Sequence, residues 1–276
     1  MTPLLLAATG GLFTGLAGML NIALEGLLLV GAFSALAAVY FTGSFTAALA
    51  AAVFAAVALS ALMAFTTLKL RSNVFITGLA VNLLAGGFAA VFSQYFFKTR
   101  GVVALPEFRS LPTLDFSFTG ELLSGYSLFV YAGWILLFFA WVVIYKTPFG
   151  YRLRACEINP EALVSLGIRP DTYRWAAFLI CGFFCGIGGS FLSLNLGAFV
   201  PNMTAGKGWI ALVVIFLGGR RPLGLLAGAF IFSLAEAFSN YAQGMHNVPA
   251  DFILAFPYIL TFIVMVLVSV QKKRLN

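Results

Sequence analysis

Charged side chains are scarce in this sequence. The chain has 276 residues, of which 9% are charged and 62% are hydrophobic. Soluble domains usually carry about 25% charged residues. A chain of this length cannot bury so much Phe, Leu, Ala and Val in one soluble core. The composition therefore excludes an ordinary soluble protein and favours one that lies in a membrane.

Metal-ligating and disulfide-forming residues are also few. There is one histidine, His246, and there are three cysteines, Cys156, Cys181 and Cys185. The last two lie one helical turn apart in an apolar stretch, where they are typical of small packing residues rather than metal ligands. We therefore expect no metal site, no cofactor and no disulfide framework.

The motifs of catalysis and of nucleotide binding are missing too. The one Gly-Lys pair, Gly206-Lys207, is followed by Gly208, so it does not match the phosphate-binding pattern G-x-x-x-x-G-K-[S/T]. With one histidine, no Ser-His-acid set can be assembled. The net charge of +7 is not accompanied by aromatic-basic clusters. We expect neither an enzyme nor a nucleic-acid-binding protein.

Long apolar runs dominate what remains. They predict an all-α polytopic membrane protein with about 8–10 transmembrane helices, forming a single transmembrane domain over residues 1–276. The run at 208–219 is short for a full span and predicts a tilted or re-entrant segment. The predicted spans are 3–19, 22–41, 46–68, 74–97, 127–145, 175–195, 208–219, 222–241 and 252–270.

Two polar interruptions suggest broken helices. NIALEG, at 21–26, follows one glycine-rich run, and NMTAGKGW, at 202–209, follows another. Broken helices in corresponding positions of two halves point to a transport site. We therefore predict two pseudo-repeated halves, although the two stretches are only weakly alike.

Basic residues predict the orientation. If residues 146–174 and the C-terminus face the cytoplasm, 12 of the 16 Lys and Arg residues do so as well, as expected of cytoplasmic loops. Residues 98–126 then form the longest loop on the other side. This predicts a protein that crosses a membrane several times, with its C-terminus in the cytoplasm and membrane lipid around the spans.

Residues 149–174 form a polar island between two apolar spans. Asn159-Pro160-Glu161 is typical of a helix start, with Asn as the N-cap, Pro in the first turn and an acid near the helix N-terminus. Leu163 and Leu166 follow, and Gly167 is a stop signal. A helix of two turns is unstable alone, so we expect a protein partner to bind it.

Acids in apolar surroundings are the next candidates. Glu25 and Glu236 either line a substrate route or bond to a neighbouring helix end, and the sequence leaves both alternatives open. Asn82, between Gly78 and Gly86, is either a ligand-binding amide or a link between helices. The predicted substrate route comprises Asn21, Glu25, Asn82, Phe88, Gln94, Asn195, Trp209, Glu236 and Asn240.

Three ordered motifs carry a family resemblance. GLAGMLNIALEGLLLVGAFSA, FGYRLRACEINPEALVSLGI and NMTAGKGWIALVVIFLGGRRPLG resemble stretches of the membrane permeases of bacterial ABC importers. The resemblance is to the group that handles ribose, branched-chain amino acids and nucleosides, and within it to the nucleoside-type subgroup. Ala23 and Glu157 each replace a glycine of the family pattern, and Leu163 replaces an alanine.

The resemblance implies a division of labour. The helix at about 159–167 would be a coupling helix that docks on a cytoplasmic ATPase, which binds the ATP. A second permease, forming a heterodimer with this chain, and an extracytoplasmic binding protein or lipoprotein would complete the importer. The implied coupling residues are Arg152, Arg154, Glu157, Asn159, Pro160, Glu161, Leu163, Leu166 and Gly167.

Two functions from different classes follow. The first is an ATP-driven importer of a nucleoside or a similar heteroaromatic, ribose-like solute, with riboflavin or a simple sugar as alternative substrates. The second is an ion-coupled secondary transporter in which Glu25 or Glu236 carries the proton.

Overall fold

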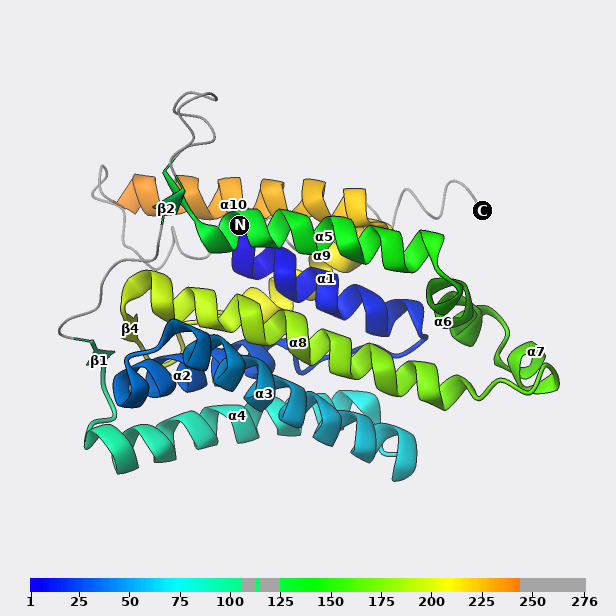
Figure 1. The fold of residues 1–276 in the computed structure, drawn as a ribbon, viewed down its shortest axis with the longest axis horizontal. Helices are drawn as coiled ribbons and strands as arrows, with labels where there is room; N and C mark the ends of the chain where they lie inside the picture. The colour runs from blue at the N-terminus through cyan, green and yellow to red at the C-terminus, as the bar shows by residue number, and fades with distance from the viewer. Residues whose placement is uncertain (106–112, 115–124, 244–276) are drawn as a thin grey trace.

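The computed structural model describes residues 1–105, 113–114 and 125–243. Within them, helices dominate (Figure 1). In chain order the elements are α1 (Thr2–Leu16), α2 (Leu24–Thr42), α3 (Phe45–Ala64), the π-helix η1 (Phe65–Lys69), α4 (Val74–Phe97), β1 (Val103–Ala104), β2 (Thr113–Leu114), β3 (Tyr126–Ser127), α5 (Leu128–Lys146), α6 (Pro148–Ile158), α7 (Pro160–Ser165), α8 (Pro170–Leu196), β4 (Ala198–Phe199), α9 (Lys207–Leu217) and α10 (Pro222–Gln243).

Six helices of the described part are long and apolar enough to cross a membrane: α2, α3 with η1, α4, α5, α8 and α10. Their bounds agree with the predicted spans to within a few residues, except that α8 begins five residues earlier. The expectation of a polytopic, mainly helical membrane protein is thus confirmed. The predicted span 252–270 lies outside the described residues, and the pseudo-repeat of two halves stays a prediction.

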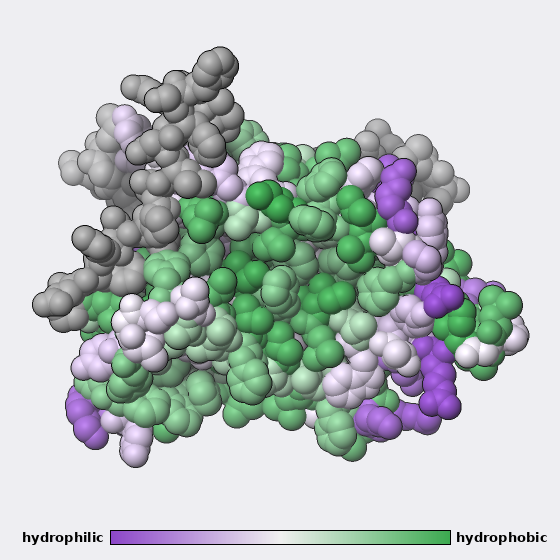
Figure 2. All heavy atoms as spheres, viewed as in Figure 1, coloured by the Kyte–Doolittle hydropathy of each residue, from purple (hydrophilic) through white to green (hydrophobic). Residues whose placement is uncertain are grey.

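The surface follows the same pattern. Figure 2 shows a broad hydrophobic band, with hydrophilic residues gathered mainly at the end that carries α6 and α7. A smaller hydrophilic group lies at the opposite end, near β1. The helices run roughly between these two ends (Figure 1), so the band has the position that lipid would cover.

Helix α8 is the centre of the bundle, and its glycines explain the close packing. A Cβ on Gly182 or Gly186 would lie 2.6–2.7 Å from the backbone of α3. A Cβ on Gly189 would lie 2.2 Å from the carbonyl oxygen of Leu28 in α2. Small residues allow helices to approach where no hydrophobic effect drives them together. Helix α1 also runs along α8, so that three helices, α1, α2 and α3, pack against it.

Two apolar helices of the described part are too short to cross a bilayer. Helix α1 has 15 residues and α9 has 11, which correspond to about 22 and 16 Å, against a hydrocarbon core of about 30 Å. After α1 the chain turns back toward the middle of the bundle before α2 begins (Figure 1). The predicted interruption near residues 18–21 and the predicted short segment at 208–219 are both present.

Two-residue ladders tie the chain at the end opposite α6. Strand β1 pairs antiparallel with β4, so that Val103 faces Phe199, and β2 pairs with β3. The first ladder joins the segment after α4 to the segment after α8. It therefore fixes where the chain begins its return toward α9.

Helix α6 was not predicted. The sequence indicates one short helix in the polar island, and the structure has two, α6 and α7. Thr147 begins α6 as its N-cap, since its side chain accepts a hydrogen bond from the Gly150 N–H, and Pro148 occupies the first turn. Thr-Pro is thus a second helix start of the same kind as Asn159-Pro160.

The packing of α8 gives a first prediction. Gly189→Ala should destabilise the folded protein, because the new methyl group meets the backbone of α2 and overpacking a tight core costs about 1–3 kcal/mol. The matched control is Gly87→Ala in α4, where a Cβ meets nothing within 4 Å. The apparent melting temperature in detergent should fall for the first variant alone. Equal melting temperatures for the two variants would contradict the packing described.

Candidate functional site

The start of α2 is closed by an amide from another helix. Asn82, in α4, donates from Nδ2 to the carbonyl oxygen of Ile22 at 3.0 Å and accepts at Oδ1 from the N–H of Gly26 at 2.8 Å. Gly78, one turn earlier, allows the approach, because a Cβ there would lie 2.6 Å from the Ile22 side chain. Asn82 thus links α4 to the start of α2, and a role of Asn82 in the substrate route stays a prediction.

Asn21 organises the chain immediately before α2. Its side chain is buried, accepts from the N–H of Ala23 at 3.0 Å and donates to the Cys181 sulfur at 3.2 Å. The amide thus folds the turn that leads into α2 and holds it against α8. Both polar ends of the side chain are used within the protein.

Glu25 closes the start of α9. Its carboxylate accepts from the N–H of Gly206 at 2.8 Å and from the N–H of Gly208 at 2.6 Å. Gly206, with φ +78°, is the residue before α9. Gly208 must lack a side chain, since a Cβ would lie 2.2 Å from the Glu25 nitrogen. The two polar interruptions of the sequence are therefore in direct contact.

The Glu25 carboxylate takes the place of the water that satisfies the first N–H groups of a helix in a soluble protein. The first N–H groups of a helix have no partner within the helix, and hydrocarbon offers none. A carboxylate supplies two strong acceptors there and is itself stabilised by the positive end of the helix dipole. Glu25 therefore bonds to the end of a neighbouring helix, which is one of the two alternatives considered for it. A role of Glu25 in the substrate route stays a prediction.

Lys207 begins α9 and pairs with Glu236. Its Nζ lies 2.6 Å from Oε1 of Glu236 in α10, and its side chain is 18% exposed. A cation in the first turn of α9 opposes the helix dipole, and Glu236 compensates it. In the sequence, Lys207 stands out because the Gly-Lys-Gly pattern directly precedes an apolar run.

The remaining predicted route residues are not gathered around this contact. Phe88 and Trp209 are 38% and 41% exposed, and Gln94 and Asn195 are exposed on α4 and α8. The side chain of Asn240 lies outside the described residues. The structure thus brings together Asn21, Glu25 and Asn82 around the start of α2, with Glu236 joined to the start of α9.

A cavity of about 250 Å³ lies between α2, α4 and the segment that leads to α9. Its wall includes Leu29, one turn after Glu25, and Asn202, four residues before Gly206. Arg100 and Ser93 supply further polar groups. Both segments of the break border this cavity, which lies at the end of the molecule that carries β1 and β4.

Helix α7 forms as predicted but presents a different apolar face. Asn159 accepts from the N–H of Ala162 at 3.0 Å, and the chain reverses at Gly167, with φ +75°. Leu163 is only 5% exposed, whereas Leu166 is 74% exposed. Leu163 therefore holds α7 to the protein, and Leu166 is free to contact a partner.

Further exposed apolar side chains flank Leu166. Ile158 is 82% exposed and Val164 is 62% exposed. A groove of about 370 Å³ runs between α6 and α7, with Tyr151, Ile158 and Leu166 in its wall. We call Ile158, Val164 and Leu166 the exposed apolar set.

The charged residues of α6 make contacts within the chain. Arg152 donates to the Tyr173 hydroxyl at 3.0 Å, and the Arg154 guanidinium lies over the rings of Tyr145 and Tyr151. Glu157 forms an ion pair with Arg220. Docking roles for these three residues, as for Pro160 and Glu161, stay predictions.

A bundle of apolar helices whose two polar breaks meet between helices, with a polar helix pair at one end, defines a multi-pass membrane transport subunit. Comparison with known sequences specifies it further. The pattern of the family described as the branched-chain amino acid transport system / permease component matches residues 1–269. The chain belongs to this family.

Curated relatives cover nearly the whole chain. The nucleoside ABC transporter permease protein NupC of Lactococcus lactis is 31% identical over 96% of this chain and 88% of its own length. The guanosine ABC transporter permease protein NupQ of Bacillus subtilis is 30% identical over 95% and 86%. The putative glucose ABC transporter permease protein TsgC13 of Haloferax volcanii is 29% identical over 88% and 75%. No solved structure matches.

Family membership confirms several expectations. The protein is the permease component of an ABC importer and is not itself the ATPase. The ATP is handled by a separate subunit, and a permease of this kind works with an ATPase and a binding protein.

The contact at α9 generates a second prediction. Glu25→Ala leaves two N–H groups without acceptors and should lower the free energy of unfolding by about 3 kcal/mol, since a hydrogen bond to a charged group contributes about 1.5–3 kcal/mol. Glu25→Gln retains one acceptor, so its free energy of unfolding should lie between those of the wild type and Glu25→Ala. Melting curves in detergent measure both. Glu161→Ala, at an exposed acid of α7, is the control, and a Glu25→Ala protein as stable as this control would refute the capping role.

Proposed function

We propose that this permease carries a nucleoside, or a similar heteroaromatic solute with a ribose-like part, across the inner membrane of a bacterium. The observation that carries the proposal is similarity along the full length to two permeases named for nucleoside and guanosine transport. Riboflavin or a simple sugar remains the alternative, and the relative named for glucose supports the sugar.

The geometry favours a route beside the break rather than through its amides. Asn21 and Asn82 use both polar ends of their side chains on the protein's own backbone and on Cys181. The cavity beside Leu29 and Asn202 has a volume of about 250 Å³, has polar groups in its wall and borders both segments of the break. The substrate enters the permease there, from the extracytoplasmic side.

The orientation follows from charge. The end with α6 and α7 carries Arg152, Arg154, Arg169 and Arg174, and positive residues collect on the cytoplasmic side. The end with β1 and β4 then faces the binding protein. The C-terminus is cytoplasmic, and the other half of the translocation unit is a second, different permease.

The ATPase docks on α7 and on Ile158, the last residue of α6. The exposed apolar set, Ile158, Val164 and Leu166, has no membrane beside it in this orientation, and exposed apolar patches of this kind mark protein–protein contact sites. Leu163 supports α7 from behind. Inactivation of the ATPase abolishes transport, in contrast to an ion-coupled secondary transporter.

Leu166→Asp tests the docking surface. The variant should fold, because Leu166 is exposed, but its co-purification with the ATPase should fall at least about tenfold, since an unpaired carboxylate buried in an apolar interface costs roughly 2 kcal/mol or more. Val102→Asp, at an equally apolar exposed position (58% exposed) at the opposite end of the molecule, is the matched control. ATPase retention by Leu166→Asp at the control level would contradict this surface.

Uptake tests the substrate class. Cells that express the complete importer should accumulate radiolabelled guanosine, and unlabelled nucleosides should compete whereas excess glucose or riboflavin should not. A variant ATPase that cannot hydrolyse ATP should reduce uptake to background. Competition by glucose or riboflavin alone would reassign the substrate, and uptake without ATP hydrolysis would favour the secondary transporter.

A further inference from the structure

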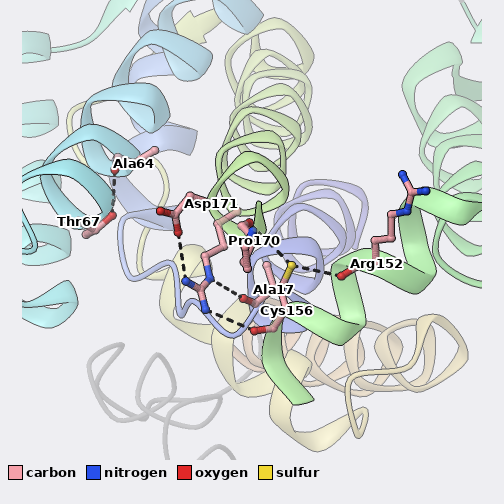
Figure 3. A network of polar contacts seen from close by, with 8 residues as sticks. Ala17, Ala64, Thr67, Arg152, Cys156, Pro170 and Asp171 are labelled. Carbon is pink, nitrogen blue, oxygen red and sulfur yellow. Dashed lines mark hydrogen bonds and ion pairs between the residues drawn. The ribbon is translucent and has the colours of Figure 1, made fainter. Parts of the chain in front are cut away.

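The contacts at the α6 end gather parts of the chain that are far apart in sequence. Figure 3 shows Ala17, Cys156 and Asp171 around one network of hydrogen bonds and ion pairs. We call the following set the junction: Ala17 and Gly18 after α1, Cys156 and Glu157 in α6, Asp171 and Arg174 in α8, and Arg220 between α9 and α10.

Arg174 connects three of these segments. Its Nε lies 3.4 Å from the carbonyl oxygen of Ala17, its Nη2 lies 3.3 Å from that of Cys156, and its Nη1 pairs with Asp171 at 3.2 Å. The Arg174 side chain is 23% exposed. A planar guanidinium with donors in fixed directions holds several acceptors at once. It therefore links the end of α1 to the last turn of α6.

Glu157 connects α6 to the turn after α9 and to the turn after α1. Its carboxylate pairs with Arg220, in the turn after α9. Its backbone lies against Gly18, where an added Cβ would be 3.2 Å from the Glu157 Cα and where φ is +76°.

The Cys156 thiol sits between these contacts. It donates to the carbonyl oxygen of Arg152 at 3.2 Å and lies 3.8 Å from that of Pro170 (Figure 3). Burial raises the pKa of this thiol, so it stays protonated and acts as a donor. The last turn of α6 is thereby held to the start of α8 as well as to Arg174.

Both broken segments begin or end at the junction. Ala17 precedes the non-helical stretch that leads through Asn21 to α2. Arg220 follows α9, whose other end is closed by Glu25. The turn between α9 and α10, which contains Arg220, is tight, because a Cβ on Gly224 would lie 2.1 Å from the Gly218 oxygen. Two connections therefore join α6 to the break: the stretch that follows Ala17, and helix α9.

We propose that Glu157 and Arg220, with Arg174, are positioning residues that transmit movement of the ATPase-facing helices to the intramembrane break. The proposal rests on the proposed function, in which α6 and α7 face the ATPase. The Glu157 and Arg220 side chains are 35% and 38% exposed, and exposed ion pairs contribute little to stability. Loss of the pair changes coupling rather than folding.

The test uses the complete importer in liposomes, with transport and ATP hydrolysis measured together. Glu157→Gln and Arg220→Gln should each lower the amount of substrate moved per ATP by about tenfold, with ATPase co-purification and melting temperature unchanged. The double variant should be no worse than either single one, because both remove the same interaction. The charge-swapped pair Glu157→Arg with Arg220→Glu should recover at least half of the wild-type ratio.

Arg221→Gln is the matched control, since it removes an adjacent exposed arginine, and it should transport as the wild type does. A wild-type ratio in Arg220→Gln overturns the proposal. So does loss of the ATPase from Glu157→Gln, which would make Glu157 a docking residue, and so does a defect of equal size in Arg221→Gln. A wild-type complex that hydrolyses ATP without moving a nucleoside would instead contradict the proposed function.

Discussion

The Glu25 carboxylate on the start of α9 is the contact on which the interior of this permease depends. A helix that begins inside a bilayer exposes N–H groups that neither lipid nor the helix can satisfy. Glu25 accepts two of them, from Gly206 and Gly208, and Asn82 satisfies the start of α2 in the same way. Because Glu25 belongs to α2 and caps α9, the two broken segments form one unit. A conformational change either carries them together or breaks a charge-assisted bond in a medium that offers no replacement.

The glycines of α8 make that unit possible. The Asn21 amide contacts Cys181, and Gly189 allows the backbone of α2 to lie directly against α8. A larger residue there would move the start of α2, and Glu25 with it, away from α9. Close packing and polar satisfaction therefore constrain each other. The central helix fixes a distance, and the distance decides whether a carboxylate reaches its donors.

The sequence predicts the spans well because hydropathy and helix length are local properties. The same holds for α7, where Asn159, Pro160 and Gly167 are read within a few residues. The partners of the polar residues are not local: Glu25 and Gly206 are 181 residues apart. Which of two roles Glu25 has, where Lys207 lies and which face of α7 is exposed all depend on neighbours from other helices. The burial of Leu163 shows this, since its spacing from Leu166 gives no sign that α6 and α8 lie behind it.

Helix α9 joins the strongest and the weakest of these contacts. At its start, a carboxylate in hydrocarbon makes two short bonds to the backbone. Near its end, Arg220 forms a half-exposed pair with Glu157, of a kind that contributes about 0–1 kcal/mol to stability. An 11-residue helix, about 16 Å long, lies between them and cannot shorten without losing its own hydrogen bonds. Displacement at one end must therefore appear at the other. The charge-assisted bonds hold the break in one geometry, whereas the pair at the α6 end forms and breaks at low cost. Such a difference suits a permease whose ATP is handled by a separate subunit.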